Sequence, residues 1–161
     1  MDEDLFKKAI NAAYRCLARS PRSRIELERR LREKNHPEPI ICQVIHRLEA
    51  YRYLDDQVFA LQWAKDRLTR RGWGPSRLRI ELKRKGIAKE WIEETLRELF
   101  EERDEETLAF DLITHRLKGR GLGDVREQRR WFSYLLRRGY SPDVIQTVLR
   151  RMKEDSEMMT E

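Results

Sequence analysis

The fold is decided by residues 78–99, which read LRIELKRKGIAKEWIEETLREL. Leu78 and Leu82 precede Gly86, and apolar residues recur at positions 92, 96 and 99. This spacing is typical of two amphipathic helices with a glycine at the C-terminal end of the first one. The pattern returns with the same offsets around Gly139 and around Asn35, and asparagine is the usual substitute for glycine at a left-handed helix end. The recurrence predicts a structural repeat of about 50 residues, stacked in a linear array that suits a long partner.

Each repeat is predicted to hold three helices, because no stretch shows strand alternation bounded by hairpin turns. We therefore expect an all-α protein in which three tandem three-helix repeats form an elongated, curved array, right- or left-handed. The repeats are expected to cover residues 1–54, 55–104 and 105–153. A polar tail at residues 154–161 follows, and we expect it to fray.

Several helix starts are marked by residues that can satisfy free amide groups. Ser23 and Glu26 have the spacing of a capping box, and Asp55 or Asp56 can cap the next helix. Pro75 suits a first helical position, where its missing N–H is not needed. In the last repeat we expect helices over 108–117, over 126–138 and from Pro142 onward.

The composition indicates large solvated faces and an anionic partner. Of 161 residues only 39% are apolar and 40% are charged, and 35 Lys and Arg against 29 Asp and Glu give a net charge of +6. This excess favours nucleic acid or an acidic partner, with simple solubility as the alternative.

Cys16 and Cys42 lack a second pair, so zinc is not expected and both are predicted to pack in the first repeat's core. No signal peptide and no membrane-spanning run is recognised, and we expect a cytoplasmic monomer with no membrane partner.

Basic residues are concentrated in the second helix of each repeat and its flanking turns, whereas acidic residues cluster near 98–106. If the second helices face the same way, they form a basic stripe. Arginine dominates it, and its planar fork suits carboxylate or phosphate. The alternative is ordinary pairing along a helix, as between Glu81 and Lys85. The candidate partner-binding residues are Arg70, Arg71, Trp73, Arg77, Lys83, Arg84, Lys85, Arg129, Arg130, Arg137 and Arg138.

Catalysis is not expected, and neither is a cofactor or a metal. Asp55 and Asp56 are adjacent, so they point in different directions on a helix start, and capping accounts for one of them. The three histidines are isolated, and the glycine-rich stretch at 119–123 follows a helix instead of a strand, which excludes a dinucleotide site. Among the tryptophans, Trp73 stands out because its Gly-flanked turn lies between arginines and could expose the ring.

Several motifs resemble the RecX family of regulatory proteins. They are Tyr53-Leu54-Asp55-Asp56 followed by Phe59-Ala60, the run from Gly72 to Leu82 with Lys85-Gly86-Ile87, Ser23 to Leu27, and Leu135 to Ser141. The match covers nearly the whole chain in order. One departure is Arg52, which stands where the family usually has glycine.

The resemblance implies three tandem three-helix units that bind the RecA recombinase. RecX proteins lodge in the groove of RecA filaments on single-stranded DNA and inhibit ATP hydrolysis, strand exchange and filament growth. They thereby damp recombination and the SOS response. The alternative from the residues is a helix-turn-helix-like protein that contacts phosphates of single- or double-stranded DNA directly and acts without RecA.

Overall fold

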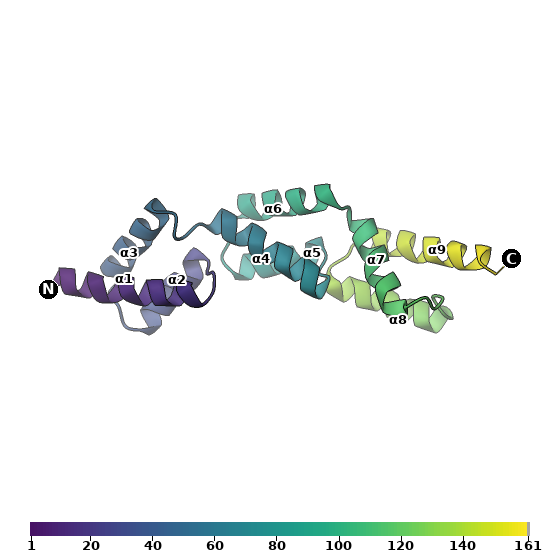
Figure 1. Ribbon diagram of the computed structural model, residues 1–161, viewed down its shortest axis with the longest axis horizontal. Coiled ribbons are helices and arrows are strands. Elements are labelled where there is room, and N and C mark those ends of the chain that lie inside the picture. Colours follow the sequence, from purple (N-terminus) through teal and green to yellow (C-terminus); the bar gives the residue numbers. More distant parts are fainter. Residues whose placement is uncertain (161) are drawn as a thin grey trace. The chain divides into compact units, whose positions relative to one another are not determined.

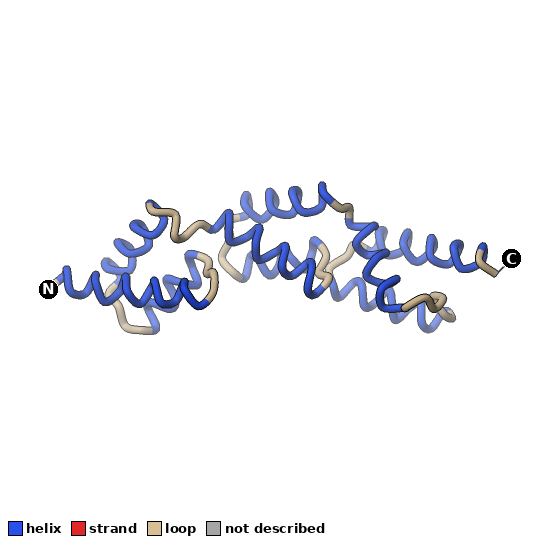
Figure 2. The backbone as a smooth tube through the Cα atoms, viewed as in Figure 1, coloured by secondary structure: helices blue, strands red, loops and turns tan. Residues whose placement is uncertain are grey.

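The computed structural model describes residues 1–160, and over these residues the chain contains only helices and loops (Figure 2). The order of the helices agrees with the expected all-α fold of three tandem three-helix units. The helices, labelled in Figure 1, are α1 (Asp2–Arg19), α2 (Arg24–Glu33), α3 (Glu38–Ala50), α4 (Asp56–Arg71), α5 (Pro75–Arg84), α6 (Lys89–Glu102), α7 (Glu105–Leu117), α8 (Val125–Arg138) and α9 (Pro142–Met158). The expected elongated, curved arrangement stays a prediction, as do the boundaries of the repeats.

The chain divides into two compact units. Unit 1 contains residues 1–62 with 82–92, and unit 2 contains residues 63–81 with the chain from residue 93 onward. In unit 1, α1, α2 and α3 pack against one another, and in unit 2 both α7 and α8 pack against α9. No helix within residues 1–160 is long and apolar enough to cross a membrane.

The cores of both units follow the apolar periodicity of the sequence. In unit 1 the largest fully buried side chains include Leu27, Leu31 and Ile45, and α1 contributes the small residues Ala9 and Ala13. In unit 2, Ile113, Leu135, Ile145 and Val148 are fully buried. Leu78 and Leu82, the residues from which the repeat is recognised, are also fully buried.

Capping confirms the expected helix starts at Ser23 and Asp55. The Ser23 hydroxyl accepts the N–H of Glu26 at 3.3 Å, and the Glu26 carboxylate accepts the N–H of Ser23 at 3.2 Å. The Asp55 carboxylate accepts the amides of Gln57 and Val58 at 3.0 and 3.2 Å. Asp55 is therefore the member of the Asp pair that caps the helix, as the sequence predicted for one of the two.

The helices of the last repeat are longer than the sequence predicted, α8 only by Val125 at its start. α7 begins at Glu105 instead of Leu108, because Asp104 accepts the N–H of Thr107 at 2.7 Å and caps it there. α9 continues to Met158 through part of the tail that was expected to fray. Glu161, the last residue of that tail, lies outside the described residues.

The two cysteines differ from expectation in one respect. Cys16 is partly buried and packs against the core of unit 1, as predicted. Cys42 is exposed, so its predicted place in the core is wrong. The core face of α3 carries Ile41, Ile45 and Leu48, and one residue beyond Ile41 the helix has already turned about 100° away from it.

The three helix ends that define the repeat adopt the left-handed conformation. The φ angles are 62° at Asn35, 78° at Gly86 and 95° at Gly139. At Gly86 a Cβ atom would lie 2.8 Å from Cβ of Ile25, and at Gly139 it would collide with the backbone of Arg77. Both glycines are needed because the N-terminal turn of the preceding second helix packs directly on them.

Candidate basic surfaces

A strip of exposed arginines runs along α8. Arg126, Arg130 and Arg137 recur with Ser133 at spacings that place them on one face of the helix, and Arg129 lies beside them around a shallow hollow. All four arginines are exposed, and none makes a hydrogen bond or ion pair within residues 1–160. We call these four residues the α8 strip. Unpaired guanidinium groups in a row offer repeated charge-assisted hydrogen bonds to an anionic partner.

Arg138 points to the other side of α8 and has a structural role. Its guanidinium donates to the backbone carbonyl of Arg71 and lies 5.0 Å from the centre of the Tyr134 ring. The hydroxyl of Tyr140, two residues later, donates to the carbonyl of Gly72 at 3.0 Å. These bonds fix the C-terminal end of α8 against the turn after α4.

The turn between α4 and α5 holds Trp73 half-buried, whereas the sequence suggested that its ring could be exposed. The guanidinium of Arg77 lies 4.9 Å from the ring centre, and those of Arg67 and Arg71 lie 5.9 Å from it. Arg77 also bonds Glu81 at 3.1 Å. Trp73 and Arg77 therefore take part in the packing of unit 2.

The basic end of α5 belongs to unit 1. Lys83 is exposed and has no ion pair within residues 1–160, and Arg84 is exposed as well. Lys85 bonds Glu26 at 2.6 Å, and its backbone carbonyl accepts the Ser23 hydroxyl. Ordinary pairing thus involves several of the candidates, including Arg70 with Asp66 at 2.7 Å, but it does not explain the α8 strip.

A second cationic feature, which the sequence did not predict, is a cleft of about 1130 Å³ in unit 2. It lies among the C-terminal end of α4, α7 and α8. Six arginines and one aspartate line it, together with several leucines and tyrosines. The arginines are Arg67, Arg70, Arg71, Arg103, Arg116 and Arg138. Three of the six had been singled out as candidates; the others come from the middle of α4, the α6–α7 turn and α7, which only the fold brings together.

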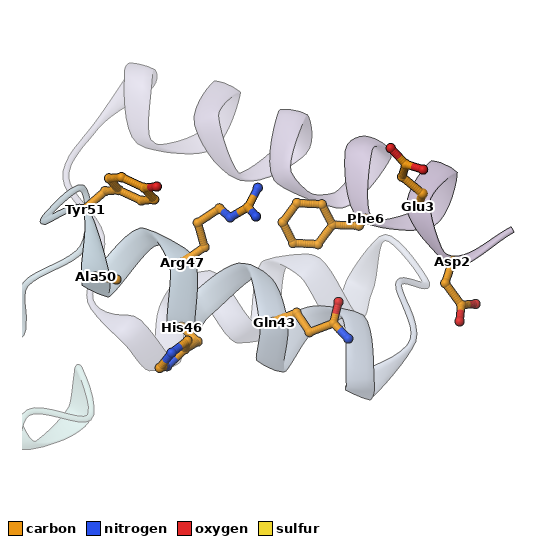
Figure 3. Close-up of a pocket in the computed structure, with 8 residues that line it drawn as sticks. All are labelled: Asp2, Glu3, Phe6, Gln43, His46, Arg47, Ala50 and Tyr51. Atoms are coloured by element: carbon orange, nitrogen blue, oxygen red, sulfur yellow. The ribbon is translucent and has the colours of Figure 1, made fainter.

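Unit 1 carries a mainly apolar groove between α1 and α3 (Figure 3). The Arg47 guanidinium lies 4.7 Å from the centre of the Phe6 ring, and Tyr51 lies at one end of the groove, with Asp2 and Glu3 at the other. Arg47 covers the Phe6 ring, whereas Tyr51 is 71% exposed, so the free aromatic surface of the groove lies at its Tyr51 end.

Comparison with protein families matches each of the three three-helix repeats to a known domain. The first three-helix domain of RecX matches residues 9–48, the second matches 55–96 and the third matches 104–149. The regulatory protein RecX of Mycolicibacterium smegmatis is 33% identical over 92% of this chain and 83% of its own length. The chain belongs to the RecX family of regulatory proteins.

RecX proteins are non-enzymatic regulators that modulate RecA. The RecX of Bacillus subtilis is 34% identical over 98% of this chain, but the chain spans only 60% of that protein's length. The crystal structure of RecX from Lactobacillus salivarius has a TM-score of 0.81 over 93% of this chain and 97% of the other, at 24% identity. A second RecX crystal structure has a TM-score of 0.75 over 91% of this chain and 72% of the other. Both structures share the fold of this RecX chain.

Proposed function

We propose that this protein binds the RecA filament on single-stranded DNA and inhibits its ATPase, strand exchange and growth. It would thereby damp recombination and the SOS response, as a monomer in the bacterial cytoplasm. The observation that carries the proposal is the presence of all three RecX domains, in order, over nearly the whole chain. A RecA modulator needs no catalytic group of its own, which suits the capping role of Asp55.

The α8 strip is the part of the candidate interface that the structure supports best. Arg129, Arg130 and Arg137 are exposed and have no partner within residues 1–160, so binding an anionic surface breaks no pair in that part of the chain. Lys83, at the end of α5, is similarly available. By contrast, Arg77, Lys85 and Arg138 already make internal contacts that stabilise the fold. Their contribution to binding would come from keeping the neighbouring residues in place.

The test is the DNA-dependent ATPase activity of RecA, measured with and without this protein. We expect ATP hydrolysis to fall as the protein is added, and to fall less when the α8 strip is neutralised. Unchanged hydrolysis over a range of protein concentrations that saturates RecA would contradict the proposal.

A second candidate function is direct binding of DNA phosphates, and the unpaired α8 strip favours it. Such binding would persist without RecA and weaken steeply with salt, because phosphate contacts release counterions. Titration of labelled single- and double-stranded oligonucleotides at several salt concentrations, with RecA absent, separates the two functions.

A further inference from the structure

The cleft of unit 2 is not used by the α8 strip, since its lining shares no residue with the strip. Within the cleft, Arg103 is paired with Asp111, and Arg70 is paired with Asp66. Arg71 and Arg116 make no ion pair within the described part of the chain. Their guanidinium groups instead lie against aromatic rings, Arg71 against Trp73 and Arg116 against Tyr134. The two guanidinium groups are thus held in place, and their N–H groups are still available as hydrogen-bond donors.

The lining of the same cleft also carries apolar side chains, which we call its floor. Leu68 and Leu112 are partly buried there, and Leu108 and Tyr140 are almost fully buried. A purely polar ligand would leave this floor in contact with water, whereas a ligand with both acidic and apolar side chains would cover it and pair with the arginines.

Nucleic acid fits the cleft less well. Single strands bind proteins through phosphate contacts and through bases stacked on aromatic rings. The Tyr134 ring already contacts Arg116 at 4.8 Å, Arg138 at 5.0 Å and the edge or face of Trp131 at 5.7 Å between ring centres. Tyr140 is only 3% exposed. Neither tyrosine of the cleft therefore offers a free ring face to a base.

We propose that the cleft among α4, α7 and α8 binds an acidic, amphipathic peptide segment of a partner protein, with carboxylates on Arg71 and Arg116 and apolar side chains on the leucine floor. The inference rests on the proposed function only in that the partner is a protein. It adds a second contact region, of different chemistry from the α8 strip.

The experiment uses the full chain without RecA and measures fluorescence anisotropy of a short labelled peptide that repeats Glu-Leu-Glu-Glu-Leu. We expect saturable binding that weakens at least tenfold when Glu is replaced by Gln, and also when Leu is replaced by Ser. Equal binding of the Gln or the Ser peptide overturns the proposal. This comparison uses the unaltered protein, so it decides the question even if a variant loses structure.

Variants then locate the site. Arg71→Gln with Arg116→Gln is expected to weaken binding of the Glu-Leu peptide at least tenfold. The matched control, Arg120→Gln with Arg150→Gln, removes two exposed arginines of unit 2 that lie outside the cleft and make no ion pair among the described residues, and it is expected to change binding less than twofold. Equal losses in both pairs would show attraction by net charge alone and contradict a cleft site.

A single-stranded oligonucleotide serves as the competing ligand class. We expect the oligonucleotide to bind equally well to the cleft pair, the variant with Arg71→Gln and Arg116→Gln, and to the control pair, the variant with Arg120→Gln and Arg150→Gln. If the cleft pair loses oligonucleotide binding and keeps peptide binding, the cleft is a nucleic-acid site and the proposal is wrong. Because RecA is absent throughout, a failure here is distinct from a failure to inhibit RecA.

Discussion

The hydroxyl of Ser23 donates a hydrogen bond of 2.6 Å to the backbone carbonyl of Lys85, 62 residues further along the chain. The same hydroxyl accepts the N–H of Glu26, whose carboxylate binds the Lys85 ammonium at 2.6 Å. The capping box of α2 is therefore also the contact that holds the end of α5 within unit 1. In unit 2, the amides of Gly74 and Ser76 make the equivalent contact with the carbonyls of Arg138 and Gly139, at 2.7 and 3.0 Å.

Replacement of Ser23 tests this junction. Ser23→Ala removes both hydrogen bonds of a fully buried hydroxyl, so we expect the free energy of unfolding to fall by about 1–2 kcal/mol. Ser76→Ala is the matched control, because Ser76 is exposed and contributes only its backbone amide; the expected change is below about 0.5 kcal/mol. Urea denaturation measures both, and equal losses would contradict the role given to the hydroxyl.

The register of the central repeat is tested at Leu82. Leu82 is fully buried, and Leu82→Ala removes apolar contacts and leaves a cavity, which should cost about 2–5 kcal/mol of unfolding free energy. Leu136→Ala, at a site that is 47% exposed, should cost much less. A loss below about 0.5 kcal/mol at Leu82 would show that the repeat had been aligned incorrectly.

The α8 strip is tested by charge reversal. Arg129→Glu with Arg130→Glu places like charges against an anionic partner. We expect binding to RecA to lose several kcal/mol of free energy, and inhibition of the RecA ATPase to weaken accordingly. Arg77 is unsuitable for this purpose because it packs on Trp73 and on Gly139.

The control reverses two exposed acids, Glu98→Lys with Glu102→Lys, and should leave inhibition nearly intact. Glu105 is avoided because its carboxylate accepts the amide of Ser141 at 2.7 Å and therefore supports the fold. If charge reversal at Glu98 and Glu102 abolishes inhibition and charge reversal at Arg129 and Arg130 does not, the binding face is the one that carries the acidic residues.

Tyr140 gives the molecule a sensitivity to alkaline pH. Burial, and next the nearby Glu105 carboxylate, raise the pKa of the Tyr140 phenol above its ordinary value near 10. Because the phenol of the unfolded chain ionises first, the stabilisation is complete below about pH 10 and is lost as the pH rises above it. The free energy of unfolding should then decline with a contribution from Tyr140 of up to about 1.4 kcal/mol per pH unit.

Tyr140→Phe removes this contribution. Near neutral pH it should cost about 1 kcal/mol through the lost hydrogen bond to the Gly72 carbonyl, and above pH 10 its unfolding free energy should decline less steeply than that of the unaltered protein. Urea denaturation across this pH range measures the slopes, and parallel slopes would refute the assignment to Tyr140.

Local features were the most predictable part of the fold. The spacing of Leu78, Leu82 and Gly86 indicates two helices and the residue that separates them, and the structure confirms it, because periodicity and capping depend on neighbours along the chain. The backbone at Arg52 was not predicted: Arg52 stands at the family's usual glycine position and adopts a left-handed φ of 58°. Cys42 was wrongly placed in the core because its position was inferred from its residue type and not from the helical periodicity of α3, whose buried residues do not include it.

Roles that depend on distant residues were not predictable. Nothing in the sequence near Lys85 indicates that its partners are Ser23 and Glu26, and nothing near Arg116 places it in a cleft with Arg71. Those relationships arise only when helices from separate parts of the chain pack together. The basic stripe was recognised as a composition, but the structure divides its members into residues that hold the fold and residues that are free to bind.

The glycine and asparagine helix ends also bear on how such a protein can grow during evolution. Gly86 and Gly139 each lie directly against the second helix of the preceding repeat because no side chain is in the way, whereas Asn35 carries a Cβ atom at the matching place. A duplicated unit added after α9 can bring its own glycine and be received at once. One inserted ahead of α1 would meet the asparagine, and would need a second mutation before it could dock in the same manner. The packing at these helix ends therefore accepts an added repeat more readily on the carboxyl-terminal side than on the amino-terminal side.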